Sequence, residues 1–98
     1  MPTITLDDRV RIPEDVVHRE VGGETVLVNL QSGFYYGLDP VGTFIWEQLI
    51  RDGGLRGAYD SLLSNYDVEP EEAGRDLLDL AENLLAKGLV QMEEREAE

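Results

Sequence analysis

The chain has 98 residues, which is enough for one domain with its own core but too few to enclose a typical multi-residue active site. It contains no cysteine and can therefore form neither a disulfide framework nor a thiolate. Eight basic and 21 acidic residues give a formal net charge of −13, which repels nucleic acid and anionic lipid and favours neutral or basic partners.

No apolar run approaches the roughly 20 residues that span a membrane, and the N-terminal residues do not resemble a signal peptide. We therefore expect a cytoplasmic protein without membrane contact. Residues 67–98 hold eleven acids and three bases, whereas residues 1–66 hold ten acids and five bases. The acidic character is thus concentrated toward the C-terminal end.

Residues 1–15 mix a short alternation of apolar residues with charges, which indicates a loosely ordered N-terminal arm with room for one strand. From Val16 the pattern sharpens, because two β-rich runs flank the pair Gly22-Gly23. Such an arrangement is typical of a hairpin with a tight primed turn.

The predicted turn fixes which residues of the hairpin share a face. It pairs Val21 with Glu24 and Val17 with Val28, and paired residues lie on the same side of a sheet. We expect the more apolar side to face the core and the other side to face water. The expected core side carries Val17, Val21, Val26, Val28 and Leu30, and the expected wet side carries His18, Glu20, Thr25, Leu27 and Asn29.

The segment Gln31-Ser32-Gly33 predicts a three-residue loop, after which Phe34-Tyr35-Tyr36 returns as a third strand. In that register Phe34 and Tyr36 face the core and Tyr35 faces outward. This aromatic strand is an open edge of the sheet, and an open edge is a liability unless it is covered or used. A peptide can add to it as a further strand through main-chain hydrogen bonds. The alternative is that two of the aromatics are core residues and the third is simply exposed.

Three helices are predicted after the sheet. Asp39 is placed to cap a helix over residues 40–51, which Gly53-Gly54 ends. Apolar residues at helical spacing predict a second helix over residues 55–65 and a third from Pro70 to about Lys87. Strands followed by helices define an α+β domain.

This domain is expected to cover residues 16–92, and residues 93–98 are expected to form an acidic, frayed tail.

The residues offer little catalytic chemistry. His18 is the only histidine and falls on the expected wet face, so no catalytic triad or metal-ligand set is complete. The acids Asp76, Asp79 and Glu82 lie three residues apart on the third helix. That spacing suits general acid–base work, a divalent ion or a basic peptide, and it is also common on solvated helix faces. We therefore predict a protein that is not an enzyme and that needs no cofactor or metal.

The stretch from Gly33 to Trp46 resembles the PqqD-like family, whose pattern runs as a Gly, a Tyr, a Leu-Asn or Leu-Asp, a Gly and then an Ile-Trp. Asp39 stands where Asn is common and keeps the capping role. The similarity covers about residues 10–92. It includes three further segments, Val26-Leu27-Val28-Asn29-Leu30, Tyr66-Asp67-Val68 and Leu84-Leu85-Ala86-Lys87-Gly88-Leu89-Val90.

The resemblance implies a winged-helix-like domain, with a three-stranded antiparallel sheet followed by three helices, known as a RiPP recognition element. Such proteins bind the leader of a ribosomally made precursor peptide and present it to a modifying enzyme. In the family the leader adds antiparallel to the third strand and lies against the third helix. The resemblance therefore implies peptide-binding roles for Phe34, Tyr35 and Tyr36 and, by helix phasing, for Arg75, Leu78, Asp79, Glu82 and Leu85.

The Tyr-Tyr-Gly-Leu form looks most like stand-alone members from lasso-peptide pathways, where the partner is a separate leader protease. Pyrroloquinoline quinone biosynthesis is the other pathway that the resemblance allows. Two further function classes stay open. One is a winged-helix DNA-binding regulator, which the negative charge opposes. The other is a small acidic enzyme or metal-binding domain built on the carboxylates of the third helix.

Overall fold

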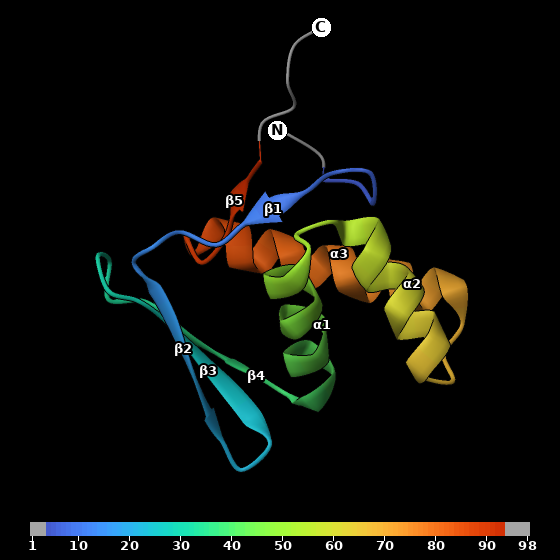
Figure 1. Ribbon diagram of the computed structural model, residues 1–98, viewed down its shortest axis with the longest axis horizontal. Coiled ribbons are helices and arrows are strands. Elements are labelled where there is room, and N and C mark those ends of the chain that lie inside the picture. The colour runs from blue at the N-terminus through green and yellow to red at the C-terminus, as the bar shows by residue number, and fades with distance from the viewer. Residues whose placement is uncertain (1–3, 94–98) are drawn as a thin grey trace, which may run out of the picture.

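The computed structural model describes residues 4–93. Its main sheet is antiparallel and contains β2 (Val16–Val21), β3 (Glu24–Asn29) and β4 (Tyr35–Leu38) in that order. Three helices follow, α1 (Pro40–Arg51), α2 (Leu55–Asn65) and α3 (Pro70–Ala86). Two short strands, β1 (Val10–Arg11) and β5 (Gln91–Met92), pair with each other as a separate small sheet (Figure 1). The expected α+β fold is confirmed.

Local signals explain where the first helix begins and ends. Asp39 Oδ1 accepts a hydrogen bond from the Gly42 N–H at 2.8 Å, and Pro40 occupies the first helical position, where its missing N–H costs nothing. Gly53 follows the helix with a φ of +83°, a left-handed conformation that glycine adopts without strain. The Gly53 carbonyl accepts a hydrogen bond from the Val10 N–H at 2.8 Å, so this turn also fixes β1 beside α1.

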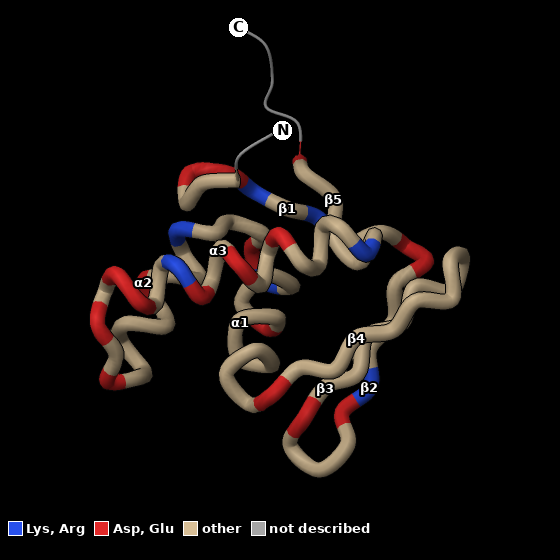
Figure 2. Tube along the Cα trace, turned by 180° about the vertical axis from the view of Figure 1, so that it is seen from behind, with Lys and Arg blue, Asp and Glu red and all other residues tan. Residues whose placement is uncertain are grey.

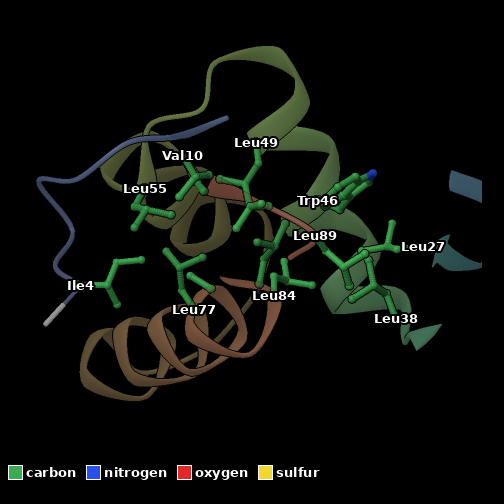
Figure 3. Packing of buried hydrophobic residues seen from close by; sticks show 14 of the residues in the cluster. Ile4, Val10, Leu27, Leu38, Trp46, Leu49, Leu55, Leu77, Leu84 and Leu89 are labelled. Atoms are coloured by element: carbon green, nitrogen blue, oxygen red, sulfur yellow. The ribbon is translucent and has the colours of Figure 1, made fainter. Parts of the chain in front are cut away.

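The core includes the N-terminal segment as well as the helices. Ile4 and Val10 are buried in one cluster with Leu55, Leu77 and other apolar residues from all three helices (Figure 3). The prediction of a loosely ordered arm is therefore corrected. The described part of residues 1–15 packs into the core and pairs through β1 with β5. Most of the expected acidic tail, residues 94–98, lies outside the described residues.

The hairpin has the predicted register but buries the opposite face. Val17 pairs with Val28 and Val21 with Glu24, and both glycines of the turn have positive φ, as a primed turn requires. The prediction of a buried valine face is nevertheless wrong. Leu27 is 0% exposed, whereas Val21 is 61% exposed. Thr25 and Asn29 are buried beside Leu27, while Val17 and Leu30 are exposed.

The hydrogen bonds of Asn29 explain how a polar residue can occupy the buried face. Its Nδ2 donates to the Gly88 carbonyl at 2.8 Å, and its Oδ1 accepts from the N–H groups of Gln31 and Ser32 at 2.9 and 3.0 Å. A buried amide that is bonded at both ends avoids the cost of an unsatisfied polar group. Valines favour strands on either face, so their alternation did not identify the core side.

The loop between β3 and β4 is one residue longer than predicted. The Asn29 N–H donates to the Phe34 carbonyl at 2.9 Å, which leaves residues 30–33 as a four-residue loop. Leu27 then pairs with Tyr36 and Val28 with Tyr35. Tyr36 packs against the core and Tyr35 is 74% exposed, as expected. The expected burial of Phe34 is wrong, because its side chain is 55% exposed.

Candidate functional site

Strand β4 has one side paired with β3 and one side without a strand partner among residues 4–93. The hydrogen bond from the Asn29 N–H to the Phe34 carbonyl sets the alternation of this antiparallel ladder. The Phe34 carbonyl and the main-chain groups of Tyr36 and Leu38 point toward β3, whereas those of Tyr35 and Gly37 point toward the open side. Two residues thus offer N–H and C=O groups to a further strand.

A hollow of about 440 Å³ lies beside this open edge, between β4, the start of α1 and α3. Apolar side chains from all three elements line it, with Leu38, Ile45 and Leu80 among them. Three exposed carboxylates also line the hollow, that of Asp39 at the cap of α1 and those of Asp76 and Asp79 on α3. We call the open edge together with this hollow the β4–α3 groove. It combines a main-chain edge with an apolar wall and negative charge.

The structure brings together only part of the predicted site. Tyr36 and Asp79 line the hollow, and the main chain of Tyr35 forms the open edge. Phe34 lies at the end of that edge. The other four predicted residues, Arg75, Leu78, Glu82 and Leu85, do not line the hollow. Leu78 and Leu85 are half-buried against the core instead.

Several residues at the groove were not among the predicted peptide-binding residues. Asp76, Leu80 and Asn83 line the hollow from α3, and Lys87 follows them at the end of that helix. The Lys87 Nζ lies 5.8 Å from the ring centroid of Phe34 and 6.0 Å from that of Tyr36, within the range of cation–π attraction. Positions 76, 80, 83 and 87 follow helical spacing, so they form one stripe along α3. The spacing was visible in the sequence, but the side of α3 that meets β4 was not.

Two other surfaces of the sheet are hollowed. The outer face, opposite the core, has a hollow of about 600 Å³ lined by valines of β2 and β3. A further hollow of about 460 Å³ lies between β1, β2 and α1. Trp46 belongs to its wall and is 1% exposed, and its Nε1 has no hydrogen-bond partner among residues 4–93. The Trp46 and His18 rings pack edge to face, with their centroids 6.2 Å apart.

The described residues do not form a metal centre. Within residues 4–93, no group of three or more His, Cys, Asp or Glu side chains is placed to hold a metal ion. In the same part of the chain, no helix is both long enough and apolar enough to cross a membrane.

Comparisons with known proteins identify the family and the fold of this chain. The family model described as Coenzyme PQQ synthesis protein D (PqqD) matches residues 24–90. TbiB1, solved in complex with the TbiA(beta) leader peptide, is 34% identical, and the match covers 89% of this chain and 99% of that chain with a TM-score of 0.74. The comparison with curated proteins finds no match.

A lasso peptide synthetase B1, solved in complex with the leader peptide, has the same fold. It is 24% identical, and the match covers 84% of this chain and 96% of that chain with a TM-score of 0.75. The segment that matches the family model contains β4, α1 and α3, which are the elements that line the groove. This chain therefore belongs to the PqqD family.

Proposed function

We propose that this protein is a non-catalytic adaptor that binds the leader of a ribosomally made precursor peptide and presents the precursor to a modifying enzyme, such as a leader protease. The observation that carries the proposal is the open edge of β4 beside a hollow lined by α3. The leader peptides in the two related structures support it. The leader adds to β4 as a fourth strand of the main sheet.

Strand addition uses main-chain groups for affinity and alternate side chains for specificity. The N–H and C=O groups of Tyr35 and Gly37 supply the main-chain hydrogen bonds. A Cβ atom at Gly37 would meet no described atom within 4 Å beyond its chain neighbours, so the outer face of the sheet beside Gly37 is sterically open. Every second side chain of the added peptide points into the hollow, and the others join Tyr35 on the outer face.

Presentation needs no reactive group on the adaptor. A leader held on β4 keeps the attached core peptide close to any enzyme that binds the adaptor, which raises its effective concentration at that enzyme. We therefore expect this protein to accelerate processing of the full-length precursor. An excess of isolated leader should compete for β4 and slow that processing.

The leader peptide of the proposed precursor is the direct probe of the edge. Tyr35→Pro removes an N–H that faces the added strand, without removing a hydrogen bond to β3. We expect this change to weaken leader binding at least about tenfold, as measured by fluorescence anisotropy of a labelled leader peptide.

Glu20→Pro is the matched control at the opposite edge of the sheet. The two-residue turn makes Val21 and Glu24 a hydrogen-bonded pair, so the Glu20 N–H points away from β3. We expect Glu20→Pro to leave leader affinity unchanged, and thermal melts of both variants check that they are folded. The proposal fails if the wild type binds no leader at tens of micromolar or if both proline variants bind as the wild type does.

A further inference from the structure

The two ends of the β4–α3 groove carry opposite charges. Asp39, Asp76 and Asp79 line the hollow next to Leu38, at the C-terminal end of β4. At the N-terminal end of β4, the Lys87 ammonium lies over the rings of Phe34 and Tyr36. The groove therefore changes from acidic to basic along β4.

These charges have no ionic partner within the described residues. The ion pairs of residues 4–93 join Arg9 and Arg56 to other acids, namely Asp7, Asp52 and Glu93. Lys87 is the only lysine in a chain with 21 acids, yet within residues 4–93 it lies over aromatic rings and forms no ion pair. Figure 2 shows red segments along α3 and a blue segment at its C-terminal end. A bound peptide can therefore supply the missing partners.

The spacing of these charges fits an added strand. Side chains of an added peptide that lie opposite Phe34 and Leu38 are four residues apart and point to the same side as Tyr36, at a separation of about 14 Å. Along α3 the rise from Asp79 to Lys87 is about 12 Å, and from Asp76 to Lys87 it is about 16 Å. One peptide can thus meet both charged ends at the same time.

We propose, building on the function proposed above, that the bound leader segment reads basic–x–apolar–x–acidic from its N-terminus to its C-terminus. Both pairings in the main sheet are antiparallel, and an antiparallel leader places its earlier residue opposite Leu38 and its later residue opposite Phe34. The basic residue meets Asp76 and Asp79, the apolar residue lies opposite Tyr36 beside Leu80, and the acidic residue meets Lys87.

This charge order gives the leader a direction and a register. Main-chain hydrogen bonds alone specify neither, because a shift by two residues restores every bond and every side-chain face. A leader shifted by two residues would move both of its charges away from the ends of the groove, and a leader with the reversed order would place like charges together at both ends. Charge therefore selects one alignment among several that the edge accepts.

A displayed library of random 15-residue peptides tests this inference without knowledge of the natural leader. We expect peptides selected on the wild type to carry Lys or Arg at one position and Asp or Glu four residues later. Selection on the triple variant Asp76→Lys, Asp79→Lys, Lys87→Glu should reverse that order. Glu82→Lys raises the net charge by the same two units on the same helix, away from the hollow, and should leave the order unchanged.

Only edge-dependent binders, which are lost on Tyr35→Pro, enter the comparison. Exchange of the basic and the acidic residue in one such peptide should weaken binding to the wild type about fivefold, and 0.5 M NaCl should reduce this difference. Edge-dependent binders without a charge order would overturn the inference and leave the proposed function standing. Failure to select any edge-dependent binder would overturn both.

Discussion

Asn29 joins two parts of the chain that both border the candidate site. Through its side chain it holds the loop that leads into β4, and it bonds to Gly88 just beyond α3. The sequence pattern placed Asn29 on the wet face because it alternates with the valines of its strand and shares a face with His18 and Glu20. Its three hydrogen bonds need the loop and the end of α3 to be near each other, which a strand pattern does not reveal.

Replacement of Asn29 by alanine should destabilise the protein by about 2–3 kcal/mol, because it leaves the Gly88 carbonyl and two loop N–H groups without these partners. Urea denaturation measures this loss. Asn65→Ala is the control, since its Nδ2 also donates to a carbonyl, that of Ser61 at 2.8 Å, but at an exposed position. We expect the control to cost less than about 0.5 kcal/mol. Equal losses would contradict a special role for Asn29.

At the scale of the elements, the hairpin is held by one face only. Leu27→Ala should cost about 2–5 kcal/mol of stability, because its side chain is completely buried against the helices. Val21→Ala should cost less than about 1 kcal/mol, since its side chain is largely exposed. Thermal unfolding by circular dichroism compares the two. A larger loss of stability at Val21 than at Leu27 would mean that the valine face, as the sequence pattern predicted, is the buried one.

The helix boundaries were predictable because their signals are local. Residues 40–51 and 55–65 were predicted as helices and are α1 and α2, with Asp39 as the cap of the first. Caps, prolines and glycines act within a turn of the residues that they affect. The turn at Gly22-Gly23 and the register of β2 with β3 were predictable for the same reason.

The buried sheet face and the groove side of α3 depend on contacts between distant residues. One extra loop residue changed which residues of β3 and β4 pair, and no sequence signal in residues 30–33 predicted the longer loop. On α3, Leu78 and Leu80 are both half-buried, but only Leu80 lines the hollow. The sequence identified the strand edge and the helix of the site, whereas the rotation of the helix came from packing.

At the scale of the whole molecule, the two ends of the described chain close on the side away from the groove. Arg9 connects them, because its Nε lies 3.1 Å from Glu93 Oε1 and its Nη1 lies 3.7 Å from Asp52 Oδ2 at the end of α1. β1 and β5 pair next to this cluster (Figure 1). The two end segments thus pair with each other through β1 and β5 and not with β4, so the edge of β4 stays open.

The net charge of −13 sets a further property of the whole molecule, its response to salt. Repulsion among the acids opposes the compact state, and salt screens it, whereas exposed ion pairs such as Arg56 with Asp7 contribute little. We expect the melting temperature to rise by about 4–8 °C between 20 mM and 500 mM NaCl, which corresponds to about 1 kcal/mol in a domain of this size.

A double variant, Glu14→Gln with Glu20→Gln, removes two exposed charges and should show a smaller rise. A melting temperature that falls with salt would mean that ion pairs outweigh the repulsion. Binding of a charge-ordered leader should weaken over the same salt range, so fold and recognition are expected to respond to salt in opposite directions.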